Sequence, residues 1–113
     1  AIHIDNKNLA YYNLNLPQGE PRLQQEQALR KQPDSAQADN DLGLTYGKSG
    51  KHQEAIKAFK EAILKKPDYG EAHYNLAVTY LILKDSKAAL REYNVLKNVD
   101  QERAIQLFDL IYG

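Results

Sequence analysis

Apolar and small side chains recur at steps of three and four residues along much of this chain, as on the buried face of an amphipathic helix. Leu42 and Tyr46 begin the clearest stretch, and Ala55 and Phe59 continue it. The pattern breaks where Gly, Ser, Asp or Pro cluster, and such residues end helices. The sequence therefore predicts helices over residues 36–48, 52–66, 70–83 and 86–98, and one more over 101–112.

The helical pattern repeats after 34 residues. Similar residues fill the same places in both copies, as Gly43 and Ala77 do, or Phe59 and Tyr93. The identical pairs are Ala38 with Ala72, Leu42 with Leu76, Thr45 with Thr79, Tyr46 with Tyr80, and Ala55 with Ala89. Because the matches are small or apolar residues at helical spacing, each copy is predicted to be one structural unit of two helices.

Both units carry a version of one motif, which reads Leu-Gly-x2-Tyr, then Ala-x3-Phe, then Pro. The first unit has it as Leu42-Gly43-x2-Tyr46, Ala55-x3-Phe59 and Pro67, and the second as Leu76-Ala77-x2-Tyr80 and Ala89-x3-Tyr93. Over 68 residues the chain resembles the tetratricopeptide repeat family. The resemblance implies an all-α fold, a right-handed α-solenoid of antiparallel helix pairs. Asp39 and His73 stand where the family has Trp, and Gln101 stands in place of the terminal Pro.

The predicted organisation is one domain over 1–113 that contains repeats at 36–69 and 70–100. Residues 101–112 carry one apolar stripe, begin after a predicted N-cap at Asp100, and are expected to cap the last repeat near the natural C-terminus. Residues 5–33 are interpreted as a degenerate repeat, with an extended arm or disordered lead over 1–19 as the alternative. Capping boxes are predicted at Asp34 with Gln37 and at Asp68 with Glu71.

The amino-acid composition excludes several classes of function. Fifteen Lys and Arg balance fifteen Asp and Glu, so the chain lacks the basic excess that a general grip on nucleic acid or anionic membrane needs. No apolar run is long enough for a membrane span, so direct membrane insertion is not expected. The absence of Cys excludes disulfides, thiolate metal sites and a Cys nucleophile. Because Met is absent even at position 1, we expect a processed or excised chain. A cytoplasmic location is slightly favoured, with periplasmic and secreted locations as alternatives.

Catalytic chemistry is not predicted. His3, His52 and His73 lie at least 21 residues apart, without metal-ligand spacing, and His73 occupies a core position of the repeat. The serines fall at predicted caps and turns, and no nucleophile elbow or phosphate loop is present. We expect no enzyme activity, no cofactor and no metal.

One basic cluster lies on the second helix of the first unit, where Glu54 and Glu61 interleave it. This pattern is typical of a solvated helix face, with an acidic protein partner as the alternative and a role in RNA reading as a weaker one. The cluster consists of Lys51, Lys57, Lys60, Lys65 and Lys66.

The resemblance implies a concave groove lined by the first helix of each unit, where a peptide or a partner helix lies. Tyr12 of the degenerate repeat is a further candidate for this groove. Val78, Leu81 and Ile82 either face the partner or pack on the terminal helix or a neighbouring chain; both alternatives stay open. Carried over by position, the groove residues are Gln37, Asn40, Asp41, Leu44, Lys48, Glu71, Tyr74, Asn75, Val78, Leu81 and Ile82.

The leading hypothesis is a non-catalytic adaptor that binds a protein or peptide partner in this groove. A clamp for a peptide C-terminal carboxylate, as in chaperone-binding members, is disfavoured because Asn40 and Leu44 stand where that clamp needs Lys and Asn. The main alternative is structural self-association through the solenoid ends, which gives a homo-oligomer. A regulatory fragment of a larger enzyme is the third hypothesis.

Overall fold

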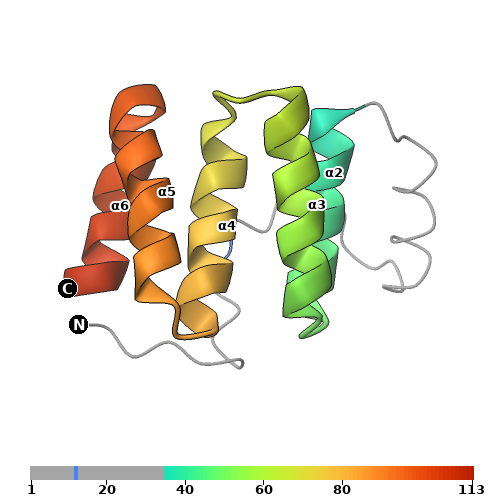
Figure 1. The fold of residues 1–113 in the computed structure, drawn as a ribbon, viewed down its shortest axis with the longest axis horizontal. Coiled ribbons are helices and arrows are strands. Elements are labelled where there is room, and N and C mark those ends of the chain that lie inside the picture. The colour runs from blue at the N-terminus through green and yellow to red at the C-terminus, as the bar shows by residue number, and fades with distance from the viewer. Residues whose placement is uncertain (1–11, 13–34) are drawn as a thin grey trace.

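The computed structural model describes Tyr12 and residues 35–113, and all regular secondary structure in this part of the chain is helical (Figure 1). The helices are α2 (Ala36–Lys48), α3 (His52–Lys65), α4 (Gly70–Ile82), α5 (Ser86–Val99) and α6 (Gln101–Tyr112). The sequence predicted each of these helices to within one residue at either end. The predicted degenerate repeat over 5–33 lies, apart from Tyr12, outside the described residues.

The helices form two layers. Short turns join α2 to α3 and α4 to α5, so the helices of each pair pack antiparallel side by side (Figure 1). Helices α2, α4 and α6 contact one another in sequence, while α3 and α5 cover them on one side, nearer the viewer in Figure 1. The structure confirms the predicted all-α solenoid of helix pairs.

Small residues let the paired helices approach closely. Gly43 of α2 lies against the fully buried ring of Phe59 from α3, and a Cβ at this glycine would collide with that ring. Ala55 and Ala62 are also fully buried on the inner face of α3. Burial of an aromatic ring at such a contact stabilises the pair by about 1.5 to 3 kcal/mol. Ala77 fills the place of Gly43 in the second unit and is likewise fully buried.

Of the predicted N-caps, the one at Asp100 is confirmed and the one at Asp68 is not. The side chain of Asp100 accepts a hydrogen bond from the backbone N–H of Arg103 at 3.2 Å, which confirms the predicted cap of α6. The predicted cap at Asp68 is wrong. The N–H of Tyr69 donates to the carbonyl of Lys66 at 3.0 Å, so this turn delays the helix and makes Tyr69 the N-cap, without a side-chain bond.

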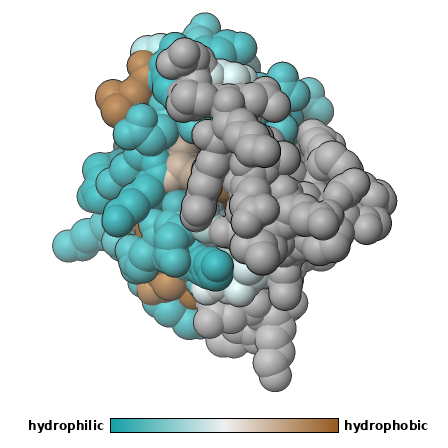
Figure 2. Space-filling model, turned by 90° about the vertical axis from the view of Figure 1, so that its right-hand side faces the viewer, coloured by the Kyte–Doolittle hydropathy of each residue, from teal (hydrophilic) through white to brown (hydrophobic). Residues whose placement is uncertain are grey.

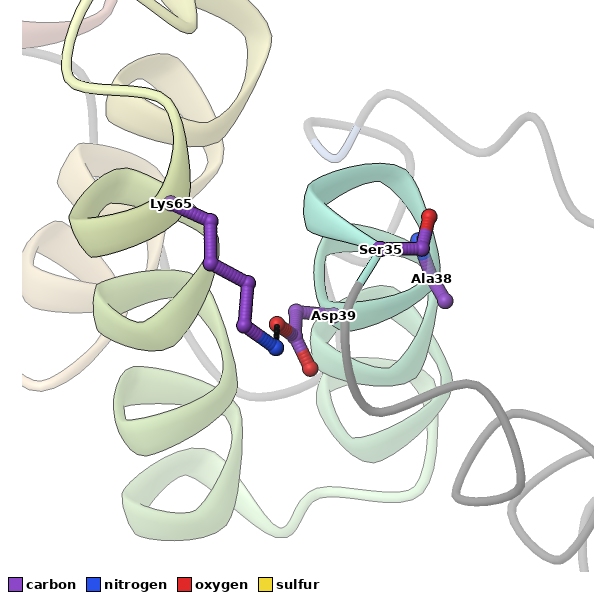
Figure 3. Close-up of polar contacts among 4 residues, drawn as sticks. All are labelled: Ser35, Ala38, Asp39 and Lys65. Carbon is purple, nitrogen blue, oxygen red and sulfur yellow. Dashed lines mark hydrogen bonds and ion pairs between the residues drawn. The ribbon is translucent and has the colours of Figure 1, made fainter.

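The start of α2 is held by two polar contacts (Figure 3). The hydroxyl of Ser35, which is the N-cap, accepts a hydrogen bond from the N–H of Ala38 at 3.1 Å. Asp34, the predicted cap, lies outside the described residues. Lys65 Nζ of α3 lies 2.6 Å from the carboxylate of Asp39, so an ion pair joins α3 to α2 at the position where the family pattern has Trp. A partly exposed pair of this kind contributes less than about 1 kcal/mol.

His73 connects three segments of the second unit. Its Nδ1 lies 2.7 Å from the carboxylate of Glu92 on α5, and its Nε2 lies 2.7 Å from the carbonyl oxygen of Pro67 before α4. Both partners only accept hydrogen bonds, so this buried ring is best satisfied when both nitrogens carry a proton. Burial lowers the pKa of His73, but the bonds to Glu92 and Pro67 and the charge of Glu92 raise it by more, and the net pKa lies above its usual value.

We predict a pH-dependent stability from His73. A histidine pKa that is higher in the folded than in the unfolded chain stabilises fully below the unfolded value, and this stabilisation is lost as pH rises through the folded value. Urea unfolding from pH 5.5 to 8.5 should show the free energy of unfolding falling with pH. Glu92→Gln should reduce that slope and cost about 1.5 to 3 kcal/mol at the acidic end, since a charge-assisted bond is lost. An unchanged slope in the variant would contradict the assignment.

Candidate binding groove

The predicted groove residues lie on the α2–α4 layer, but the structure covers about half of them. Asp41, Lys48, Glu71 and Leu81 are partly exposed, and Gln37 is exposed. The accessible part is therefore a mostly polar rim, which we call the α2–α4 rim and define by these five residues. The buried members are Asn40, Leu44, Tyr74, Asn75, Val78 and Ile82.

The buried polar members connect the two helices. Asn75 Nδ2 of α4 donates to Asn40 Oδ1 of α2 at 3.2 Å, and both side chains are fully buried. The hydroxyls of Thr45 and Thr79 donate to the carbonyl oxygens of Asp41 and Asn75, at 3.0 and 2.9 Å. Burying a polar group without a hydrogen bond costs free energy, so these contacts favour one register of α2 against α4. Asn40 Nδ2 is a buried exception, without a hydrogen-bond partner among the described residues.

Negative charge concentrates on the α2–α4 rim. Burial, and after it the nearby charge of Glu71, raise the pKa of Asp41 to about 6. Burial and the charges of Glu71 and Asp41 also raise the pKa of Tyr69 to about 12, against smaller opposing effects from Asn40 and Arg103. At neutral pH ionised Asp41 therefore carries a cost in free energy, and a cation placed beside it would relieve that cost.

Tyr12 is buried against the same layer. Its hydroxyl lies 3.1 Å from Thr79 Oγ1 and 3.3 Å from His52 Nδ1, and its ring packs against Gly47. Burial raises the pKa of Tyr12 to about 12, although the bond to Thr79 partly offsets this. The sequence suggested Tyr12 for the groove but did not connect it with Gly47, His52 or Thr79. The sequence did contain one indication of this contact. When the two units are aligned at the 34-residue offset, Gly47 takes the place of Leu81, and a glycine leaves room for another side chain.

The basic cluster is exposed along α3, as the sequence predicted for Lys51, Lys57, Lys60, Lys65 and Lys66. Figure 2 views the α2–α3 end and shows a mostly hydrophilic surface over the described residues. Within the part of the chain that the structure describes, no cluster of three or more His, Cys, Asp or Glu side chains could hold a metal ion. Among the same residues, no helix has the length and apolarity to cross a membrane.

A comparison with protein families decides the assignment. A model described as tetratricopeptide repeat matches residues 40–103, which is more than half of the chain. The chain belongs to the tetratricopeptide repeat family. The match spans α2 to α5 and the first residues of α6, so it covers both units that the periodicity predicted. Repeats of this family are protein-interaction modules, and the described residues of this chain are arranged as one.

Three known proteins are similar to this tetratricopeptide repeat chain. A chloroplastic protein of Arabidopsis thaliana is 36% identical over 73 residues, which is 60% of this chain and 22% of that protein. The peroxisomal targeting signal receptor of Saccharomyces cerevisiae is 41% identical over 54 residues, 48% of this chain and 9% of the receptor. The receptor of the same name from Eremothecium gossypii is 42% identical over 52 residues, which is 46% of this chain and 9% of that receptor. The chain thus matches less than a quarter of each relative's length.

We predict that Asp41→Asn stabilises this chain at neutral pH. The carboxyl pKa of about 6 lies above its ordinary value of 3.8, so ionised Asp41 is disfavoured in the folded state once pH exceeds that range. The amide removes this cost, which is on the order of 1 kcal/mol after solvent screening. Chemical denaturation at pH 7.5 should show the gain, and at pH 3 it should vanish. Asp68→Asn, at an exposed carboxylate in the turn before α4, is the control. Equal gains in both variants would refute the electrostatic explanation.

Proposed function

We propose that this tetratricopeptide repeat chain is a non-catalytic interaction module that binds a peptide or helix of a partner along the α2–α4 rim. The observation that carries the proposal is the half-buried carboxylate of Asp41, whose pKa is raised first by burial and then by the charge of Glu71 on α4. A Lys or Arg side chain of a partner segment would stabilise ionised Asp41, while partly exposed Leu81 offers apolar contact at the other end of α4. Two relatives are named as receptors for a targeting signal, which supports a recognition role.

The test is selection of binding peptides from a random library displayed on phage, with affinities then measured by calorimetry. Selected peptides should be enriched in Lys and Arg. Glu71→Lys should weaken their binding at least tenfold, because each ionic contact at a partly buried site contributes about 1.4 kcal/mol or more.

The matched control is Glu61→Lys, the same charge reversal on the exposed face of α3. It should change affinity less than twofold. If both reversals weaken binding equally, long-range charge rather than the α2–α4 rim governs recognition. If neither does, the partner binds elsewhere.

A second candidate function is self-association through α6. Its outer side carries Ile105, Phe108 and Tyr112, of which Ile105 is 62% exposed. The Phe108 ring centroid lies 4.8 Å from that of Tyr112 and 6.0 Å from that of Tyr93 on α5, so the aromatic rings form one surface. Contiguous exposed apolar surface of this kind marks sites of protein association. The apolar face of α6 therefore favours contact with a second copy.

For self-association we predict concentration-dependent sedimentation between 1 and about 300 μM, the range in which weak interfaces of modest area form. Phe108→Glu should give a monomer throughout, because it places a charge in the centre of the apolar face. Leu64→Glu alters another exposed apolar residue, on α3, and should leave the association unchanged. A wild-type chain that stays monomeric over the whole range would contradict this candidate.

A further inference from the structure

Tyr12 fills a socket built from three helices. Gly47 near the end of α2, His52 at the start of α3 and Thr79 in α4 surround its phenol end; we call these three residues the phenol socket. A Cβ at Gly47 would lie 2.8 Å from Tyr12 Cζ and 3.0 Å from its hydroxyl oxygen, so the missing side chain provides the space for the ring. Tyr12, His52 and Thr79 are all buried.

The hydrogen bonds in the phenol socket have a defined direction. The Thr79 hydroxyl donates its proton to the Asn75 carbonyl oxygen, so its oxygen accepts from the Tyr12 hydroxyl. Because the Tyr12 proton is donated to Thr79, the contact with His52 is a hydrogen bond when Nδ1 carries a proton and donates it to the Tyr12 oxygen. Burial lowers the pKa of His52. The chain of donors runs from His52 through Tyr12 and Thr79 to the α4 backbone.

This arrangement selects a phenol. The guest atom must accept from His52 and donate to Thr79, and a hydroxyl does both at once, whereas a carboxylate only accepts and an ammonium only donates. A phenylalanine would fill the space but leave His52 Nδ1 without its partner and Thr79 Oγ1 with its bond to the Asn75 carbonyl alone. His52 Nε2 already has no hydrogen-bond partner among the described residues, so the ring depends on Nδ1 for its polar contact. Tyrosine is therefore the side chain that the socket accommodates.

The phenol socket is present in the first unit and has no counterpart in the second. We call the turn that joins the two helices of a unit its junction: α2 to α3 in the first unit, and α4 to α5 in the second. At the 34-residue offset, Leu81 replaces Gly47 and Ser86 replaces His52. The leucine carries a side chain where Gly47 has none, and the serine lacks the imidazole donor. The repeat pattern alone does not require a phenol here, so these residues are a feature added to the first junction.

We propose that the phenol socket is a specificity subsite that takes a tyrosine side chain of the partner segment, and that Tyr12 is an internal ligand which competes for it. The proposal rests on the proposed function, because the subsite lies on the same α2–α4 layer as the rim. A side chain tethered to its own site competes through its effective concentration, so weakening the hold of Tyr12 strengthens binding of the outside ligand.

The first experiment uses small phenols on Tyr12→Ala. NMR titration of the full chain should show saturable binding of p-cresol at the Gly47 and Thr79 amides, at least tenfold tighter than that of toluene, which lacks the hydroxyl. Adding Thr79→Val to this variant should remove most of that preference while the volume stays similar. Equal binding of both probes, or no binding by a variant that retains its helical circular dichroism, would overturn the proposal.

The second experiment does not require an emptied socket. Tyr12→Phe keeps the ring and loses only the hydroxyl bonds. A synthetic peptide of residues 8–17 of this chain should bind Tyr12→Phe about tenfold more tightly than it binds the wild type. The same peptide with Phe in place of Tyr12 should lose this advantage. If both peptides bind both proteins alike, no outside tyrosine enters the socket and the proposal fails.

Two outcomes distinguish this proposal from the rim function alone and from self-association. If Glu71→Lys weakens library peptides but neither socket experiment shows phenol selectivity, the rim function stands and the subsite is wrong. If the wild type forms a dimer that Tyr12→Phe dissociates, the socket takes Tyr12 of a second copy, which overturns the assignment to a partner protein.

Discussion

The close approach of α2 and α3 at Gly43 is the contact on which the described structure depends. The Phe59 ring lies where a Cβ of residue 43 would be, and it is fully buried there. This contact brings the pair together so that alanines of α3 can face α2 across a short distance. Once the first pair is fixed, the turn of Pro67 and Tyr69 places α4 against both helices, and the second pair repeats the geometry with Ala77. A solenoid has few contacts between distant repeats, so each such pair must be well packed on its own.

Between α2 and α4 the molecule uses polar contacts instead of small residues. Asn40 and Asn75 hydrogen-bond across the interface, and threonine hydroxyls are bound to the helix backbones behind them. Apolar packing tolerates sliding of one helix along another, whereas a buried amide pair has one favourable register. The fixed register in turn holds Thr79 at the depth that the Tyr12 hydroxyl reaches. The phenol socket is thus a consequence of how the two units are joined.

The helices and their pairing could be predicted from the sequence because both depend on local spacing. Periodicity places Leu42 and Tyr46 on one face of α2, and Ala55 and Phe59 on one face of α3, whatever lies opposite. The 34-residue offset identifies the second copy. Depth of burial could not be predicted in the same way. Whether Tyr74 or Val78 faces solvent depends on what packs across the α2–α4 layer, and both are buried. Tyr12 meets His52 and Thr79 across separations of 40 and 67 residues, and such contacts leave no periodic trace.

The junctions of the two units differ in sequence, and the exposed or ligand-accepting surface lies in a different place in each unit. At the first, Gly47 and His52 leave an opening with a polar end, and it is filled by a side chain from outside the two units. At the second, Leu81 and Ser86 stand in the places of Gly47 and His52, and an exposed apolar surface lies further along the chain, at Phe108 and Tyr112 on the outer side of α6. Zero net charge means that neither surface benefits from long-range attraction. The proposed recognition therefore depends on short-range contacts: charge at the α2–α4 rim, and shape and hydrogen-bonding direction at the phenol socket.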